Sequence, residues 1–80
     1  MPMDRLQAME MFVRVVETAS FSKAAREFRT TQPTVTKQVA AIEQRLKVRL
    51  LNRNTRGVSV TEPGALYYEK CKAIVRDAEE

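Results

Sequence analysis

The sequence has no histidine, no tryptophan, a single cysteine and only two glycines among its 80 residues. A single cysteine excludes an internal disulfide, and the absence of histidine argues against a zinc site. The sequence also lacks a glycine-rich loop that could cradle phosphates and a pair of carboxylates in an obvious pocket. These absences argue against an enzyme and against a metal or other cofactor held by this chain.

Long apolar runs are also missing. Residues 11–16 are the nearest to one, and Arg14 interrupts them; a membrane span needs about 20 apolar residues. No charged and then apolar leader opens the chain. We therefore expect a cytoplasmic protein without membrane contact. Its 80 residues make one domain, close to the lower size limit for a self-sufficient core.

The charge of +4 is unevenly distributed along the chain. Residues 23–56 carry nine basic and two acidic groups, a net charge of +7, whereas residues 1–22 carry −1 and residues 62–80 carry −2. A basic block between near-neutral or acidic ends is typical of a surface that faces phosphates. The alternative is a solvated basic face without a partner, which is common on small domains.

Residues 20–39 have the pattern of two short helices separated by a tight polar turn. We expect the first helix to begin at Ser22, whose hydroxyl suits an N-cap, and to run to about Phe28. After a turn over residues 29–31, Thr31 is the expected N-cap of the second helix. Pro33 then falls in the first turn, where its missing N–H costs nothing.

The second helix has one apolar side and one polar side. Spacings of four, three and four predict a buried stripe made by Val35, Val39, Ile42 and Leu46. The side chains off this stripe are polar or basic: Gln32, Thr34, Thr36, Lys37, Gln38 and Lys47. A helix with such an exposed side is what a helix-turn-helix protein inserts into the major groove.

The remaining segments complete a mainly α winged helix-turn-helix. A first helix is expected from about Asp4 to Thr18, with Phe21 beneath it. Its buried side is predicted to be lined by Leu6, Met9, Phe12, Val13 and Val16. Residues 49–54 and 58–60 predict two short strands, a wing, joined by a turn in which Gly57 takes a positive φ.

A long last helix is expected after Thr61, its N-cap, and it carries an apolar seam. The seam and the positions beside it are Leu66, Tyr67, Tyr68, Cys71, Ile74, Val75 and Ala78. Either the helix folds back on the first helix and completes a monomer core, or part of the seam meets a second copy and makes a homodimer. Cys71 is interpreted as a buried small hydrophobe in preference to a redox sensor.

The motifs together resemble the N-terminal DNA-binding domain of LysR-type bacterial transcriptional regulators. The resemblance rests on SFSKAA (20–25), QPTVTKQV (32–39), Ile42 and Glu43 followed by Leu46, and RLLNRNTRGVSVTEPG (49–64). It implies a DNA-binding domain over residues 1–60 and a linker, or dimerisation, helix over residues 61–80. It also implies a C-terminal effector-binding domain, absent from this chain, that takes a small-molecule effector. Double-stranded DNA and a homodimer, with a tetramer for the full-length protein, are the implied partners.

The resemblance also implies roles for individual residues. The implied DNA-binding set is Ser22, Lys23, Thr31, Gln32, Pro33, Thr34, Thr36, Lys37, Gln38, Arg53 and Arg56. The implied dimerisation set is Leu66, Tyr67, Cys71, Ile74, Val75 and Ala78. Arg53 has the alternative of bracing the wing, and Thr31 of serving only as a cap.

Base chemistry agrees with the recognition-helix residues independently of the resemblance. Gln32 can pair bidentately with adenine, Lys37 can donate to guanine, and the Thr36 methyl can contact that of thymine. The chain departs from the family at Lys47, where glycine is common and a left-handed turn costs other residues about 1 kcal/mol. It also departs at Pro63, in place of a common alanine.

The sequence therefore predicts a sequence-specific DNA-binding domain that reads an interrupted inverted repeat through one recognition helix per half-site and a basic wing. The competing hypothesis is a winged-helix module that binds protein through its last helix. The basic block separates the two hypotheses, because a protein-binding module has no need of it.

Overall fold

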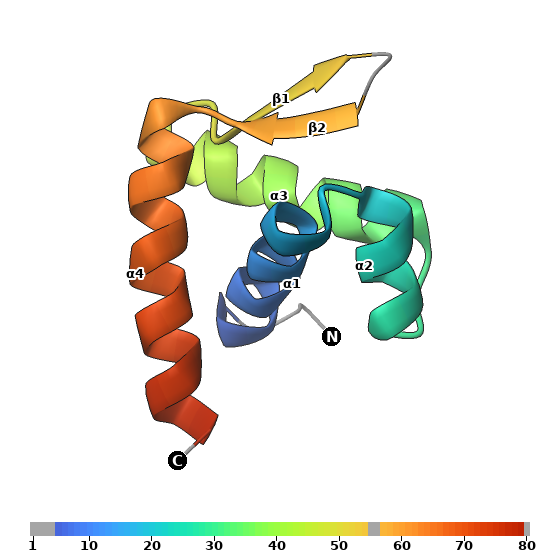
Figure 1. Cartoon of the computed structure of the whole chain (residues 1–80), viewed down its shortest axis with the longest axis horizontal. Helices are drawn as coiled ribbons and strands as arrows, with labels where there is room; N and C mark the ends of the chain where they lie inside the picture. The colour runs from blue at the N-terminus through green and yellow to red at the C-terminus, as the bar shows by residue number, and fades with distance from the viewer. Residues whose placement is uncertain (1–4, 55–56, 80) are drawn as a thin grey trace.

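The computed structural model describes residues 5–54 and 57–79. Over these residues the chain forms four helices and a two-stranded hairpin (Figure 1). In chain order they are α1 (Arg5–Thr18), α2 (Phe21–Glu27), α3 (Gln32–Leu46), β1 (Leu51–Asn54), β2 (Gly57–Val60) and α4 (Glu62–Glu79). The predicted fold class, three helices with a two-stranded wing and then a long helix, is confirmed.

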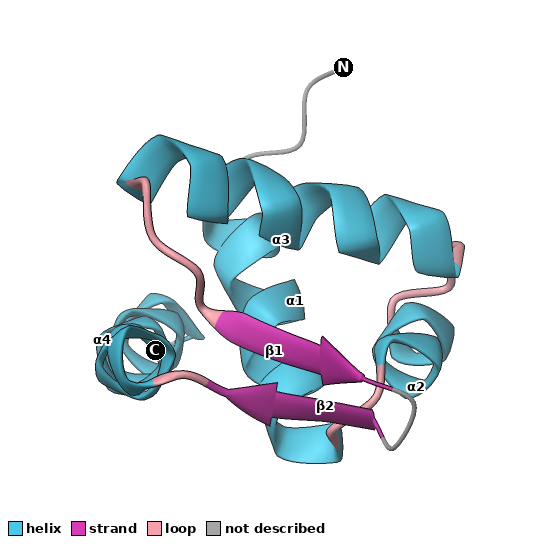
Figure 2. Cartoon of the chain, turned by 90° about the horizontal axis from the view of Figure 1, so that it is seen from above, coloured by secondary structure: helices cyan, strands magenta, loops and turns pink. Residues whose placement is uncertain are grey.

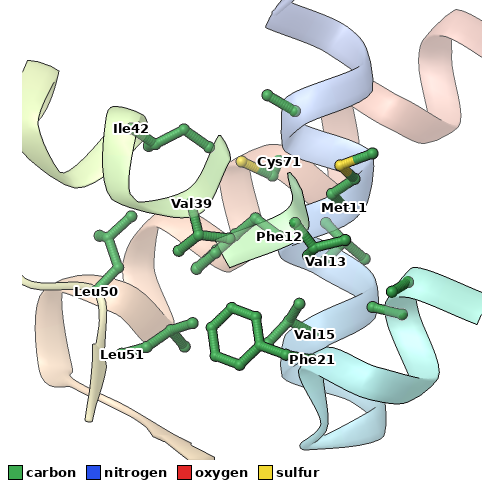
Figure 3. Packing of buried hydrophobic residues seen from close by; sticks show 14 residues of the cluster. Met11, Phe12, Val13, Val15, Phe21, Val39, Ile42, Leu50, Leu51 and Cys71 are labelled. Atoms are coloured by element: carbon green, nitrogen blue, oxygen red, sulfur yellow. The ribbon is translucent and has the colours of Figure 1, made fainter. Parts of the chain in front are cut away.

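Helix α1 is the centre of the domain, since α2, α3 and α4 all pack against it. Seen from above, the wing runs from α4 towards α2, and α3 lies alongside it (Figure 2). The core forms where side chains of α1, α2, α3, the start of β1 and α4 converge (Figure 3). This arrangement places α3 at the edge of the domain, with only one side covered.

The buried side of α1 differs from the predicted stripe. Met11 and Val15 are buried, although neither was predicted to be, whereas Leu6 is 36% exposed. Met9 and Val16 are only partly buried, and Phe12 and Val13 are buried as predicted. Because three helices surround α1, the covered surface is wider than one amphipathic stripe and has a different centre.

The beginning of α2 corrects the sequence-based prediction. The N-cap is Ser20, whose Oγ accepts a hydrogen bond from the Lys23 backbone N–H at 3.1 Å, and so the predicted cap at Ser22 is wrong. Starting the helix at Phe21 carries that ring into the core, where it is 6% exposed. Burial of Phe21 thus selects between two serines that are both suited to capping.

The two ends of α3 follow from its sequence. Thr31 caps the N-terminus by accepting from the Thr34 backbone N–H at 3.3 Å, and Pro33 lies in the first turn. At the other end Lys47 adopts the left-handed conformation, with φ 57° and ψ 41°. The left-handed exit that the resemblance implies is therefore kept, although lysine and not glycine occupies this position. Along the helix Val35, Val39 and Ile42 are buried, but Leu46 is 41% exposed, because the described part of the chain leaves it uncovered.

The segment between α3 and the wing is held by the side chain of Glu43. Its Oε2 accepts hydrogen bonds from the backbone N–H groups of Leu50, at 2.8 Å, and Leu51, at 3.2 Å. Leu50 and Leu51 are themselves buried in the core. Helix α3 and the wing are therefore connected by these two hydrogen bonds as well as by the backbone between them.

The same segment also anchors α4. The Thr61 backbone N–H donates to the Leu50 carbonyl at 3.0 Å, and the Thr61 hydroxyl donates to the Arg49 carbonyl at 2.6 Å. The Thr61 oxygen also accepts from the Gly64 N–H at 3.0 Å, which confirms the predicted N-cap. A Cβ on Gly64 would lie 2.0 Å from the Leu50 carbonyl oxygen, so only glycine allows this close approach.

The wing is a short antiparallel hairpin with Leu51 opposite Val60 and Asn54 opposite Gly57. Its strands are close to the predicted ranges, and Gly57 has a positive φ of 130° as predicted. The remainder of the predicted turn, Thr55 and Arg56, lies outside the described residues, as does the predicted helix start at Asp4.

Charged side chains tie the helices together on the surface. Arg14 of α1 donates to both carboxylate oxygens of Glu27 of α2, at 2.6 and 3.1 Å, and to Glu17 at 2.5 Å. The other oxygen of Glu17 accepts from the hydroxyl of Tyr68, on α4, at 2.5 Å. This hydrogen bond, with burial and the charge of Glu17, raises the pKa of Tyr68 from 10.0 to about 12.

We predict that Glu43→Ala lowers the free energy of unfolding by about 1–3 kcal/mol, because it leaves two backbone N–H groups near the core without their charged acceptor. Urea denaturation measures the change. Gln44→Ala, an exposed position one residue along the same helix, is the matched control. Equal stabilities for the two variants would contradict the proposed role of the carboxylate.

We predict that Glu17→Gln returns the pKa of Tyr68 towards 10, as measured by NMR titration of its phenol carbon. Because the raised pKa favours the protonated phenol in the folded state, its contribution to stability is complete below about pH 10 and is lost as the pH rises through about 12. Glu10→Gln, on the same helix, is the control and should leave the titration unchanged. A Tyr68 titration that does not respond to Glu17→Gln would refute this contact.

Candidate nucleic-acid interface

The uncovered side of α3 carries the predicted recognition residues. Gln32, Pro33 and Lys37 are exposed, while Thr34, Thr36 and Gln38 are partly exposed. They share the helix with Val35, Val39 and Ile42, which are fully buried on the other side. The structure therefore presents an amide, hydroxyls and an ammonium group to solvent from one helix face.

Helix α2 holds the beginning of α3 in place. It packs against both α1 and α3, and its Ala24 and Ala25 are buried in the core. The turn between the helices includes Arg29 with a positive φ of 54° and a hydrogen bond from the Thr30 N–H to the Ala25 carbonyl at 3.0 Å. The N-terminal end of α3 is thus fixed by backbone geometry and packing.

Four of the predicted contact residues are hydrogen-bonded to one another in pairs. The hydroxyl of Ser22 donates to the side-chain oxygen of Gln32 at 2.9 Å. The hydroxyls of Thr31 and Thr34 lie 2.8 Å apart and share a hydrogen bond. Lys23 is exposed in the first turn of α2, and its side chain is free of a described ion pair.

The wing is braced against α2 by Arg53. Its guanidinium carbon lies 4.6 Å from the centre of the Phe21 ring, which is a cation–π geometry. The exposed Arg53 therefore serves the bracing role given as its alternative, and its contact with DNA stays a prediction. Arg56 lies outside the described residues. In Figure 2, α2 lies between the N-terminal end of α3 and the far end of the wing.

The basic and acidic side chains of the basic block differ in what they contact. Its described basic side chains are all exposed: Lys23, Arg26, Arg29, Lys37, Arg45, Lys47, Arg49 and Arg53. Both of its acidic side chains are engaged within the domain, Glu27 by Arg14 and Glu43 by backbone N–H groups. The hydrogen bond from Arg14 holds the pKa of Glu27 below its usual value. Neither carboxylate is therefore directed at the exposed cations.

The predicted dimerisation residues fall into two groups. Cys71 is fully buried in the core of its own chain, and Tyr67 packs on Phe12 with ring centres 5.5 Å apart. Burial raises the pKa of the Cys71 thiol, which fits a small core residue and not a reactive thiol. Leu66 and Ile74, by contrast, are 67% and 46% exposed. Val75 is half-buried and Ala78 is exposed.

The last helix therefore completes the core of its own chain, as the first alternative required, and also leaves apolar residues exposed, as the second required. Tyr67 and Cys71 complete the core against α1, while Leu66, Ile74 and Ala78 remain uncovered in the single chain. A depression of about 300 Å³ next to Leu66 is lined by Leu46 of α3, by Val48 and Leu50 of the segment that follows, and by Pro63, Tyr67 and Lys70 of α4. No helix in the described part of the chain is long and apolar enough to cross a membrane.

Comparison with known proteins places these features in a family. Residues 6–65 match the model described as bacterial regulatory helix-turn-helix protein, lysR family. The chain is 37% identical over 78 residues to the HTH-type transcriptional activator AaeR of Escherichia coli K12, covering 98% of this chain and 25% of that protein. It is 39% identical over 71 residues to the regulator CrgA of Neisseria meningitidis, covering 89% and 24%. The chain therefore spans about a quarter of the length of these relatives.

Solved structures of DNA complexes share this fold. The DNA-binding domain of BenM in complex with catB site 1 DNA has a TM-score of 0.90 and 32% identity, over 95% of this chain and 84% of that chain. The CbnR DNA-binding domain in its DNA complex has a TM-score of 0.89 and 30% identity, over 95% and 87%. The relatives are transcriptional regulators and not enzymes.

Proposed function

This chain belongs to the LysR family of bacterial helix-turn-helix regulators and is a DNA-binding domain of that family, and we propose that it reads an interrupted inverted repeat as a homodimer. Each α3 enters the major groove of one half-site, and each wing lies against the neighbouring backbone or minor groove. The proposed location is the cytoplasm, where the DNA of a bacterium is accessible to a regulator.

The observation that carries this proposal is the exposed polar face of α3 within a surface whose acids are engaged elsewhere. Lys37 can donate to guanine O6 and N7, and the Thr36 methyl can contact thymine. The surrounding exposed cations supply phosphate contacts, which dominate affinity. A module that binds protein has no use for this combination.

The proposed dimer uses the uncovered side of α4. Leu66, Ile74 and Ala78 follow one another at spacings of eight and four, and so lie along one side of the helix. Leu46, at the end of α3, adds a fourth exposed apolar side chain beside Leu66. A second copy would cover these residues, and its two-fold symmetry would require two half-sites in opposite orientation.

The test is selection of binding sites from a random duplex pool, followed by titration of the enriched and a scrambled sequence at two salt concentrations. We expect a two-fold symmetric site bound far more tightly than the scramble. If a dimer neutralises about six phosphates, the slope of log affinity against log salt should be about −5. A shallow slope, or no binding at low salt, would contradict the proposal and favour the protein-binding module.

We predict that Lys37→Ala weakens binding by about 1–3 kcal/mol and relaxes the preference at a single base position of each half-site. Titration against single-base variants of the selected site measures both effects. Lys72→Ala, an exposed lysine of α4 whose ammonium lies over the Tyr68 ring, is the control and should preserve the base preferences.

We predict a different pattern for Arg56→Ala, because we assign Arg56 to the phosphate backbone or minor groove. The variant should bind all sequences more weakly by a similar factor, and its salt slope should be shallower by about 1 for each phosphate that it no longer neutralises. The same titrations measure both quantities. Weaker binding confined to one base position would contradict the assignment.

A further inference from the structure

The hydrogen bond between Ser22 and Gln32 joins the two helices at their exposed ends. Ser22 is the second residue of α2 and Gln32 is the first residue of α3, and the distance from Oγ to Oε1 is 2.9 Å. Because Ser20 is the N-cap of α2, the Ser22 hydroxyl is not needed for capping. It is directed instead at the residue predicted to read a base.

This bond directs the oxygen of the Gln32 amide at Ser22. A primary amide has an oxygen that accepts and an NH₂ group that donates. Bidentate pairing with adenine requires both at once, with the oxygen accepting from N6 and the NH₂ donating to N7. Ser22 takes one of the two lone pairs of this oxygen and directs the oxygen at α2. In this orientation the NH₂ group is the part of Gln32 left to contact DNA, and bidentate adenine pairing requires the amide to turn away from Ser22.

The backbone positions of Gln32 and Ser22 are fixed by the fold. The backbone of Gln32 is fixed between the Thr31 cap and Pro33, in the first turn of α3. Helices α2 and α3 pack against each other, and Ala24 and Ala25 of α2 are buried in the core. The packing of α2 against α3 therefore sets the distance between the backbones of Ser22 and Gln32.

We propose that Ser22 is a positioning residue that determines specificity, holding Gln32 as a hydrogen-bond donor that reads guanine N7 and O6 or thymine O4. This inference rests on the proposed function, since it requires α3 to lie in the major groove. It replaces two expectations: direct DNA contact for Ser22, which the resemblance implies, and bidentate adenine pairing for Gln32.

Base-preference measurements on the full chain test the proposal. Gln32→Ala identifies the base position, because it flattens the preference there. Ser22→Ala should then raise the affinity for adenine relative to guanine or thymine at that position by about fivefold or more, the scale of one base contact. Ser22→Thr keeps the hydroxyl and should retain the original preference. In a Gln32→Ala background, Ser22→Ala should have no further effect on preference.

Gln32→Glu provides a second test, because a carboxylate has no donor. With one oxygen held by Ser22, the other should accept from cytosine N4, and the preference at that position should switch to cytosine. If the amide instead faced Ser22 with its NH₂ group, the wild-type chain would already prefer a donor base, and Gln32→Glu would leave the preference unchanged. That result would overturn the proposal.

A measurement without DNA separates this inference from the proposed function. In the free chain, Ser22→Ala should shift the side-chain amide NMR signals of Gln32, and Ser22→Thr should shift them much less. Unchanged signals together with an unchanged base preference would overturn the positioning role. Shifted signals in a chain that binds no DNA would overturn the proposed function, and with it the reading of bases, while leaving the hydrogen bond established.

Discussion

The geometry of the domain depends on the backbone at Leu50, where three elements meet. Glu43 of α3 accepts from the N–H groups of Leu50 and Leu51, while the Leu50 carbonyl accepts from Thr61, at the start of α4. Gly64 lies so close to that carbonyl that a side chain would collide with it. The recognition helix, the wing and the last helix are thus fixed to one short buried segment.

This junction connects the reading surface to the proposed dimer surface. In the proposed dimer, the polar face of α3 selects the bases of each half-site, and the uncovered side of α4 sets the distance between the two half-sites. Since both helices are tied to Leu50, their relative direction is set within one chain. An inverted repeat of fixed spacing is the DNA that two such rigid units joined by α4 would match.

Local signals in the sequence were sufficient for much of the fold. The cap at Thr31, proline in the first turn of α3 and the positive φ of Gly57 follow from the residues alone. The left-handed exit at Lys47 does not, because lysine does not favour that conformation. The choice of Ser20 over Ser22 as a cap was not predictable, because burial of Phe21 decides it. The exposure of Leu46 and the width of the buried side of α1 likewise depend on tertiary packing.

The candidate site was predictable as a set of residues but not as a set of contacts. Spacing placed the polar residues on one side of α3, yet it did not indicate that Ser22 holds Gln32. Arg53 braces the wing by lying over the Phe21 ring, and these two residues are far apart in the sequence. The spacing of residues within a single helix cannot predict such a contact. In α4, one apolar seam serves both the core, through Cys71, and the uncovered side, through Leu66 and Ile74.

The most direct test of the account is an NMR titration of the chain with its selected DNA duplex. We predict that the largest shifts of backbone signals occur at residues 32–38. Shifts concentrated on α4, with the signals of α3 unaffected, would contradict the account.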